Sequence, residues 1–318
     1  MDLPFIYKYQ PVLLDDFEYE DELLLLIRTL LKMDNLNILF IGDSGCGKTS
    51  LINVIIREYY GKEPQNDNIL IINSLKDQGI TYYRNDVKIF CQTSSSIIGK
   101  KKILILDDID NINEQSQQVF RNCIDKYSHN VHFISSCNNS QKVIDSIQSR
   151  LTVIKIKALH HTNLIKIINK ISDKENILLD DECKKFILSI SNNSIKILIN
   201  YLEKLKLINL PITLELVSDV CTNITFKDFE YFTKYCKIEK NMVNAVQLIY
   251  KLFDKGYSVM DILDSYFLFV KTTTILTEDE KYKIIPIICK YITVFHNIHE
   301  DEIELALFTN SLIKTFTN

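Results

Sequence analysis

Hydrophobic residues in the first half of the chain gather in short continuous runs rather than at alternating positions. Runs of this length, bounded by polar or turn-forming residues, are typical of strands that are buried on both faces. The runs are Ile38–Ile41, Ile69–Ile72, the apolar part of Lys100–Asp110, Val131–Ser136 and Leu151–Ile156. Between them, apolar residues recur at helical spacing. Strands that alternate with helices predict an α/β fold, with helices on both faces of a parallel sheet, to about residue 157.

The first predicted helix, Glu20–Lys32, lies before the first strand. The segment Phe5–Pro11 precedes this helix. We expect that segment to be extended, because prolines lie at both ends and a proline disfavours helix in the preceding residue. The predicted helices of this half are Glu20–Lys32, Leu51–Tyr59, the later part of Asn73–Thr93, Glu114–Tyr127 and the short stretch Ser140–Ile147.

From His160 onward the pattern changes to one helix after another, and no strand signal returns. Gly256 and Pro286 are expected to break the last helical stretch. We therefore predict three domains: an α/β domain at 1–157, a helical lid at 158–222 and an all-α domain at 223–318. The predicted helices lie at about 161–175, 180–191, 194–209 and 213–222, and then through 225–318.

A glycine-rich loop follows the first strand and has the pattern Gly42-x-x-x-x-Gly47-Lys48-Thr49. A predicted strand precedes it and a predicted helix follows, which is the context of a phosphate-binding loop. Three of the seven glycines of the chain lie here, so backbone N–H groups can surround an anion at the helix N-terminus. Lys48 would reach the β- and γ-phosphates of ATP, and Thr49 would hold Mg²⁺. The other loop positions expected at the phosphates are Asp43, Ser44, Gly45, Cys46 and Ser50.

Two carboxylates end the third strand. Asp107 would lie by the Mg²⁺, and Asp108 would polarise an attacking water. A solvated acidic turn would also fit this pattern in isolation. The phosphate loop upstream favours the nucleotide interpretation.

Three further polar residues have two interpretations each. Asn138 follows the fourth strand and is either a residue that orients water or senses the γ-phosphate, or a turn asparagine. Arg150 is either an arginine finger for a neighbouring γ-phosphate or a surface arginine. Lys196 begins a lid helix and either reaches the phosphates or is solvated. Local sequence does not decide these cases.

Composition limits the classes of partner. The chain has 318 residues and a net charge of −4, so no overall basic field indicates nucleic acid, and a DNA-binding surface must be local. None of the eight cysteines forms a C-x-x-C pair, so zinc is not expected. No basic leader is visible. The most apolar stretch, Leu23–Leu31, is interrupted by Arg28 and is too short to cross a bilayer, so no membrane role is expected.

Several motifs together resemble those of the small subunits of replication factor C, which are AAA+ sliding-clamp loaders. Phe5 to Pro11 resembles the W-x-E-K-Y-R-P box, and Leu106–Asp110 stands at the position of L-D-E-A-D. Phe133–Asn139 with Ile147–Arg150 resembles F-I-L-S-C-N with I-Q-S-R-C, and Asn193–Leu202 resembles G-D-M-R-R-A-I-N-x-L. The resemblance implies that Ile6 and Gln10 border the adenine, and that Asn138, Arg150 and Lys196 are sensor 1, the trans-acting finger and sensor 2.

The resemblance also implies the partners: other clamp-loader subunits in a hetero-oligomeric ring, a sliding clamp and primer–template DNA. Residues 223–318 would be the collar that holds the ring together. Arg84 and Lys88, four residues apart on one predicted helix, and Arg121 on the next would contact backbone phosphates, although such charges are also common on solvated surfaces. An intracellular site is expected, the nucleus for a cellular protein or a cytoplasmic replication site for a viral one.

Two departures from the family motifs bear on ATP hydrolysis. Asp108 stands where the family has glutamate, which retracts the carboxylate by one methylene, and Lys196 replaces an arginine and cannot form a bidentate fork with phosphate. Three functions remain open: an ATPase of a clamp-loader ring, an ATP-binding subunit of that ring that hydrolyses little, and a different AAA+ DNA motor.

Overall fold

The computed structural model describes residues 3–61, 66–73, 80–208, 211–221, 224, 226–295 and 301–317. The chain forms two compact units. One comprises Met1–Lys174 with Asn193–Asn200, and the other Glu175–Asn192 with Tyr201–Asn318. The predicted division into three domains at 157 and 222 stays a prediction.

The first unit contains a five-stranded sheet of order β2-β3-β4-β1-β5, in which each paired strand is parallel to its neighbour. Ile38 of β1 pairs with Ile134 of β4 on one side and with Thr152 of β5 on the other. This order brings the carboxyl ends of β3, β4 and β1 next to one another. The strands are β1 (Ile38–Ile41), β2 (Ile69–Asn73), β3 (Lys102–Asp107), β4 (Val131–Cys137) and β5 (Thr152–Lys155).

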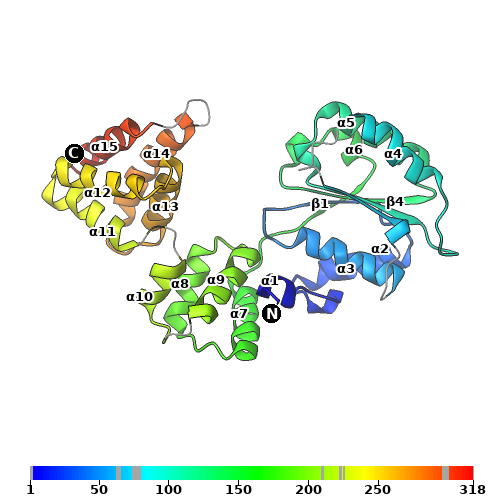
Figure 1. Ribbon diagram of the computed structural model, residues 1–318, viewed down its shortest axis with the longest axis horizontal. Coiled ribbons are helices and arrows are strands. Elements are labelled where there is room, and N and C mark those ends of the chain that lie inside the picture. The colour runs from blue at the N-terminus through cyan, green and yellow to red at the C-terminus, as the bar shows by residue number, and fades with distance from the viewer. Residues whose placement is uncertain are drawn as a thin grey trace. The chain divides into compact units, whose positions relative to one another are not determined.

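Helices cover both faces of the sheet, which confirms the predicted α/β fold. Figure 1 shows α2 (Asp21–Lys32) and α3 (Lys48–Tyr60) on one face and α4 (Ile80–Gln92), α5 (Glu114–Tyr127) and α6 (Asp145–Gln148) on the other. The apolar faces of α4 and α5 pack on the sheet around Val87, Phe120 and Phe133.

Two local predictions near the sheet are wrong. The segment after Pro4 is not extended, because Phe5–Lys8 forms one turn of helix, α1. Pro4 precedes this turn at its N-cap and Pro11 follows it, so neither ring removes a helical hydrogen bond. The stretch 140–147 is two separate turns, a 3₁₀ turn at Ser140–Lys142 and α6, because Val143 between them is extended and buried in the core.

Short 3₁₀ turns also connect the longer elements of this unit, at Leu14–Asp16, Asn66–Asn68 and Ile109–Asn111. Beyond β5, the described part of the chain contains helices and no strand. The helix α7 (His161–Glu175) belongs to the first unit as far as Lys174, together with the first residues of α9 (Ile195–Ile208).

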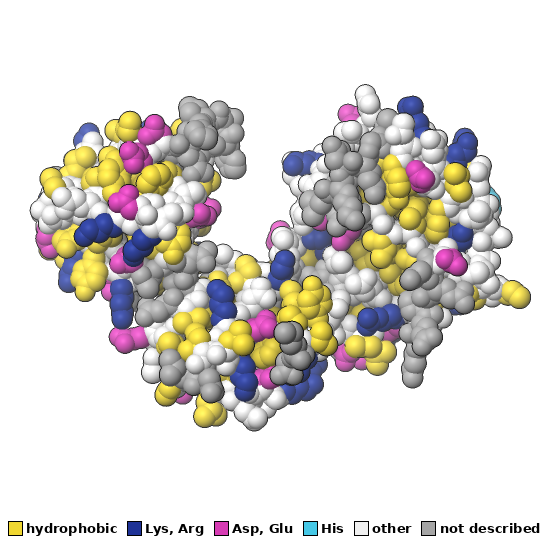
Figure 2. Space-filling model, viewed as in Figure 1, with side chains coloured by type: hydrophobic (Ala, Val, Ile, Leu, Met, Phe, Trp, Pro, Cys, Tyr) yellow, Lys and Arg dark blue, Asp and Glu magenta, His cyan; other side chains and the backbone are white. Residues whose placement is uncertain are grey.

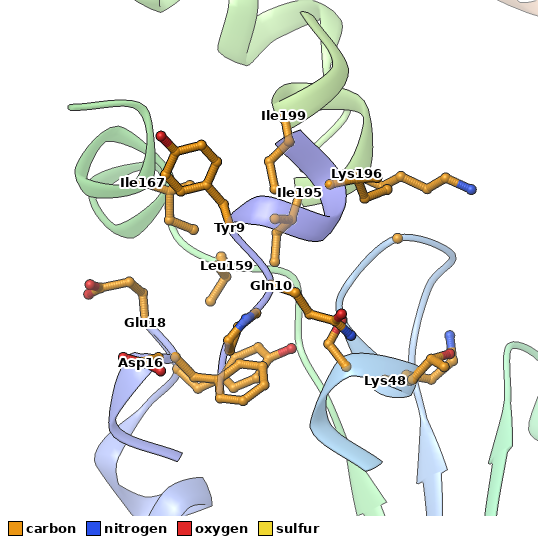
Figure 3. Close-up of a pocket in the computed structure, with 18 of the residues that line it drawn as sticks. Tyr9, Gln10, Asp16, Glu18, Lys48, Leu159, Ile167, Ile195, Lys196 and Ile199 are labelled. Atoms are coloured by element: carbon orange, nitrogen blue, oxygen red, sulfur yellow. The ribbon is translucent and has the colours of Figure 1, made fainter. Parts of the chain in front are cut away.

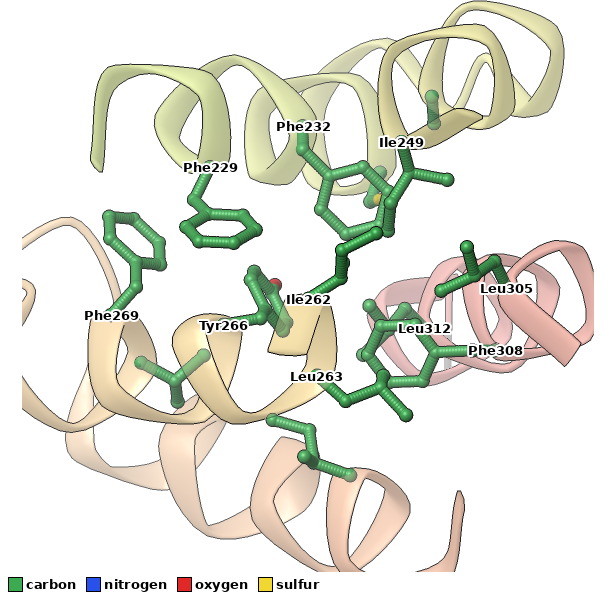
Figure 4. Close-up of a cluster of buried hydrophobic side chains, with 14 of the residues drawn as sticks. Phe229, Phe232, Ile249, Ile262, Leu263, Tyr266, Phe269, Leu305, Phe308 and Leu312 are labelled. Atoms are coloured by element: carbon green, nitrogen blue, oxygen red, sulfur yellow. The ribbon is translucent and has the colours of Figure 1, made fainter. Parts of the chain in front are cut away.

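The second unit is helical, as predicted. Its core is rich in aromatic side chains, with Tyr266 packed among Phe229, Phe232 and Phe308 (Figure 4). Its elements are α8 (Asp181–Ile190), the later part of α9, α10 (Leu214–Cys221), α11 (Phe226–Lys234), a π-helix (Tyr235–Glu239), α12 (Met242–Asp254), α13 (Val259–Thr272), α14 (Glu278–Phe295) and α15 (Ile303–Thr317).

Pro286 does not break the helix, contrary to expectation, and lies inside α14. The ring removes only the hydrogen bond to the carbonyl of Tyr282. Both residues are exposed, so water can bond to that carbonyl, while Ile284 and Ile288 remain buried. Gly256 does separate two helices, α12 and α13. None of the described helices is both long and apolar enough to cross a membrane.

Candidate nucleotide site

The glycine loop connects β1 to α3, as the motif predicts, and its conformation requires glycine at two positions. Gly45 has φ +77° and Gly47 has φ +101°, values that side chains disfavour. A Cβ on Gly45 would collide with the Ser194 hydroxyl, and one on Gly47 would lie 2.5 Å from the Tyr19 hydroxyl. The loop is thus enclosed by Tyr19 on one side and the start of α9 on the other.

Lys48 is buried at the base of this loop, with 6% of its surface exposed. Its Nζ donates to the carbonyls of Gly42 at 2.8 Å and Asp43 at 3.0 Å, and to Oδ1 of Asn138 at 2.7 Å. The first residue of α3 is therefore in contact with the residue after β4. Those two positions are ninety residues apart in sequence.

Asp107 ends β3 and lies beside Thr49. The Thr49 hydroxyl donates to Asp107 Oδ2 at 3.0 Å, and the Ser136 hydroxyl donates to Asp107 Oδ1. Ser136 Oγ in turn accepts the backbone N–H of Asp108 at 3.0 Å. A hydroxyl and a carboxylate oxygen at this distance are the protein ligands that Mg²⁺ uses beside phosphates.

Asp108 adopts a left-handed backbone conformation, with φ 55° and ψ 51°, which turns its side chain toward Asn138. Asn138 Nδ2 donates to Asp108 Oδ1 at 3.4 Å. Burial, followed by the charges of Asp107 and Asp110, raises the pKa of Asp108 above its ordinary value. Asp110 also holds the loop after β4, because its Oδ2 accepts the N–H groups of Asn138 at 3.1 Å and Asn139 at 3.0 Å.

A pocket of about 390 Å³ lies against this cluster, and all of its lining residues belong to the first unit. The glycine loop and Lys48 lie at one end, and the opposite side carries Tyr9 and Ile167 together with the carboxylates of Asp16 and Glu18 (Figure 3). Most of the predicted nucleotide-binding and catalytic residues line it: Ile6, Gln10, Ser44, Gly45, Gly47, Lys48, Thr49, Ser50, Asp108, Asn138 and Lys196.

The sequence prediction missed part of the pocket wall. Tyr19 is buried and donates from its hydroxyl to the Cys46 carbonyl, and burial raises the pKa of this phenol. Phe17 stacks on Tyr19, with ring centroids 5.1 Å apart. The other missed residues are Tyr9, Pro11, Asp16, Glu18, Leu159, Ile167, Lys170, Ile171, Ile195 and Ile199. No spacing marks these residues in sequence, although Tyr9 and Pro11 lie in the box that resembles the family motif.

Lys196 projects from the start of α9 beside the loop (Figure 3). The Ile195 N–H donates to the Gly45 carbonyl at 3.1 Å, which fixes the start of the helix against the loop. The Lys196 side chain is exposed. The structure therefore places Lys196 at the glycine-loop end of the pocket.

The remaining predicted residues lie outside the pocket. Arg150 follows α6 and bonds to Asp125 and to the Ser146 carbonyl. Arg84 and Lys88 are exposed on α4, and Arg121 lies on the adjacent α5. On the face shown in Figure 2, basic side chains are interspersed with acidic and hydrophobic ones, so no broad basic patch is visible there.

The family model described as "ATPase family associated with various cellular activities (AAA)" matches residues 38–159, which contain the glycine loop and both strand-end carboxylates. The match to this ATPase family implies that the chain binds a nucleotide. Among solved structures, the fold is similar to the RuvB Holliday junction branch migration motor of Thermotoga maritima. The TM-score is 0.52 at 16% identity, over 73% of this chain and 80% of that one. At this identity the likeness concerns the fold alone.

Curated relatives match over most of the chain. A replication factor C small subunit of Acanthamoeba polyphaga mimivirus is 29% identical over 90% of this chain and 89% of its own length. The replication factor C small subunit of Methanosphaera stadtmanae is 30% identical over 72% of this chain and 71% of its own length. A replication factor C subunit 2 of Dictyostelium discoideum is 26% identical over 89% of this chain and 84% of its own length. The chain therefore belongs to the family of replication factor C small subunits.

Proposed function

We propose that this chain binds ATP with Mg²⁺ as a subunit of a clamp-loader ring, which opens a sliding clamp and places it on primer–template DNA during replication. One observation carries the proposal: Lys48, Thr49 and Asn138 line one pocket, where Lys48 bonds to Asn138 and Thr49 bonds to Asp107 at the end of β3. Membership of the replication factor C small subunit family supports the biological role.

The residues of the site would have different roles in binding and hydrolysis. The N–H groups of the glycine loop and the Lys48 ammonium bind phosphate oxygens. Thr49 and Asp107 would hold Mg²⁺, which neutralises charge on the phosphates when bound. Asp108 and Asn138, which are in contact with each other, would orient the attacking water. Leu159 and Ile167, which line the pocket, would provide apolar surface for the adenine.

Lys48→Ala tests the nucleotide assignment. Removal of the buried ammonium should weaken ATP binding at least about tenfold, because hydrogen bonds to charged groups are the stronger ones. Calorimetry measures the affinity of the isolated chain, and Lys32→Ala, which removes an exposed lysine of α2, is the matched control. Unchanged ATP affinity in a folded Lys48→Ala protein would contradict the assignment.

Clamp loading itself requires the assembled ring. The chain is co-expressed with the other loader subunits and the clamp of the same genome, and clamp retained on primed circular DNA is measured. We expect ATP-dependent loading that is lost in rings carrying Lys48→Ala and kept in rings carrying Lys32→Ala. A ring that assembles but loads no clamp would contradict the biological role and leave the ATP site standing.

A second candidate function is that of a ring subunit that binds ATP but hydrolyses little. Two observations favour it: the shorter carboxylate of Asp108, whose pKa is raised, and the single ammonium of Lys196 in place of a planar fork. The ATPase rate of the isolated chain, compared with that of the ring, separates the two functions.

A further inference from the structure

Asp125 lies near the end of α5, and its carboxylate contacts two arginines. Its Oδ1 accepts the Nε–H of Arg150, and its Oδ2 pairs with Nη2 of Arg121 at 3.2 Å. One carboxylate therefore joins the predicted arginine finger to a residue predicted to contact DNA.

The contacts of Arg150 fix the plane of its guanidinium. Nη1 donates to the Ser146 carbonyl at 2.7 Å, while Nε donates to Asp125 from a different element. Nη2 has no hydrogen-bond partner among the described residues. Because the guanidinium is planar and rigid, two fixed nitrogens also set the direction of the third, which remains available for a phosphate.

The contacts among Arg121, Asp125 and Arg150 add little to the stability of the fold. The side chains of Arg121, Asp125 and Arg150 are 32%, 38% and 30% exposed, respectively. Ion pairs with this much exposure contribute little to folding, since solvent screens the charges. Substitution of Asp125 should therefore leave the fold intact, and an effect on catalysis would report on the placement of Arg150.

We propose that Asp125 is a positioning residue that orients Arg150 toward the nucleotide of a neighbouring subunit and couples it to Arg121. The proposal rests on the proposed function, because the predicted finger meets the nucleotide of a neighbouring subunit only in a ring. A DNA phosphate bound by Arg121 would replace Asp125 Oδ2 at Nη2. The carboxylate would then be held by Arg150 alone, and DNA binding would tighten the orientation of the finger.

The test uses the assembled ring and measures its ATPase rate at saturating clamp, with and without saturating primer–template DNA. Asp125→Asn keeps the size of the side chain and removes its charge. We expect it to lower the DNA-stimulated rate by roughly tenfold to a hundredfold, the scale of a displacement near 1 Å, without changing the chain's own ATP affinity or melting temperature. Asp125→Glu, which keeps the charge, should retain an intermediate rate. Glu114→Gln, which removes an exposed charge from the same helix, should have no effect.

The coupling between DNA binding and Arg150 is measured by the ratio of the ATPase rates with and without DNA. Arg121→Ala should reduce the ratio of the rates with and without DNA even when DNA is saturating. Combining it with Asp125→Asn should lower that ratio no further, because both changes break one linkage. Additive effects of the two substitutions would overturn the coupling.

Arg150→Ala is the reference variant, because it removes the residue that Asp125 would position. If Arg150→Ala lowers the ring ATPase and Asp125→Asn does not, the positioning role is wrong and the proposed function stands. If Arg150→Ala leaves the ring ATPase unchanged, Arg150 is no finger and the positioning role falls with it, whereas the proposed ATP binding and clamp loading are tested independently by Lys48→Ala. If Asp125→Asn lowers the ATPase rate and also prevents ring assembly, the decisive variant is Asp125→Glu. A ring that assembles with Asp125→Glu and hydrolyses ATP more slowly than the unmodified ring supports the positioning role, and one that hydrolyses at the normal rate overturns it.

Discussion

At position 47 the absence of a side chain decides whether the phosphate loop can form. Gly47 has φ +101° and lies under the Tyr19 hydroxyl, so any side chain there meets both backbone strain and a steric clash. Gly61, at the end of α3, has the similar φ of +96°, but a Cβ there would meet nothing within 4 Å. The two glycines share a positive φ, although ψ is 14° at Gly47 and −168° at Gly61, and they differ in their surroundings.

This pair gives a prediction at the scale of one residue. Gly47→Ala and Gly61→Ala should each destabilise the fold by about 1–3 kcal/mol, because both positions have a backbone conformation that side chains disfavour. Only Gly47→Ala should also weaken ATP binding, and Tyr19→Phe should restore part of that loss by removing the oxygen that the methyl group meets. Thermal unfolding and calorimetry measure the two effects. Equal ATP affinities in the two glycine variants would contradict the role of Tyr19 in shaping the loop.

A second prediction at this scale concerns Asp108. The carboxylate is held at the β3 end by the Ser136 bond to its N–H and faces Asn138, so its length determines how far it extends toward a water. Asp108→Glu should raise the ATPase rate of the ring, by as much as about 10² if the carboxylate moves about 1 Å toward its best position. Steady-state ATPase assays measure it, with Asp21→Glu, which lengthens an exposed carboxylate at the start of α2, as the control. A slower Asp108→Glu ring would show that Asp108 does not orient the water.

At the scale of elements, α4 and α5 present the cations predicted to meet DNA. The two helices pack side by side on the face of the sheet opposite α2 and α3 (Figure 1). The net charge of −4 leaves little long-range attraction for DNA, so these few side chains would have to act at short range.

We expect Arg84→Ala with Lys88→Ala to weaken binding of the ring to primed DNA similarly for all sequences. Because two phosphate contacts are lost, the slope of log K against log salt should become shallower by about 2. Fluorescence anisotropy across a salt series measures both quantities. Lys32→Ala with Arg57→Ala removes the same charge from α2 and α3 on the other face and should change neither. If both double variants lower the DNA affinity equally, the loss reflects the overall charge of the protein and not contacts of Arg84 and Lys88 with DNA phosphates.

At the scale of the whole molecule, the ATP pocket lies within the first unit, whereas Arg150 lies outside that pocket. A cation that does not reach the chain's own nucleotide can serve catalysis only at another nucleotide. The second unit has an aromatic core of its own, and the role of its residues as a collar stays a prediction.

Arg150→Ala should therefore leave ATP affinity of the isolated chain unchanged and lower the ATPase of the ring. An arginine finger in better-measured phosphoryl-transfer enzymes is worth about 10³–10⁵ in rate at the site that it serves. Rings are assembled with Arg150→Ala in this subunit and an intact phosphate loop in its neighbour, and turnover is measured. If the isolated chain already hydrolyses ATP at the ring's rate and Arg150→Ala abolishes that activity, the residue acts on its own nucleotide and the ring mechanism fails.

The sequence by itself determined the α/β fold, the phosphate loop and the strand-end carboxylates. Each is encoded in a contiguous stretch: an apolar run specifies a buried strand, and Gly42 to Thr49 contains the whole loop. Asn138, Arg150 and Lys196 could be assigned roles only through resemblance to family motifs. The pocket confirms the proximity of Asn138 and Lys196 to the loop, and their roles stay predictions.

Tertiary structure alone decided what depends on contacts between distant segments. Tyr19 and Ile195 have no distinguishing spacing, yet each bonds to a carbonyl of the glycine loop. The helical turn at Phe5–Lys8 and the continuation of α14 through Pro286 both contradict local propensity, because in each case proline lies where no buried hydrogen bond needs its N–H. The bridge from Arg121 through Asp125 to Arg150 joins two elements that no sequence pattern pairs. Local propensity specifies the elements, and packing specifies which side chains meet.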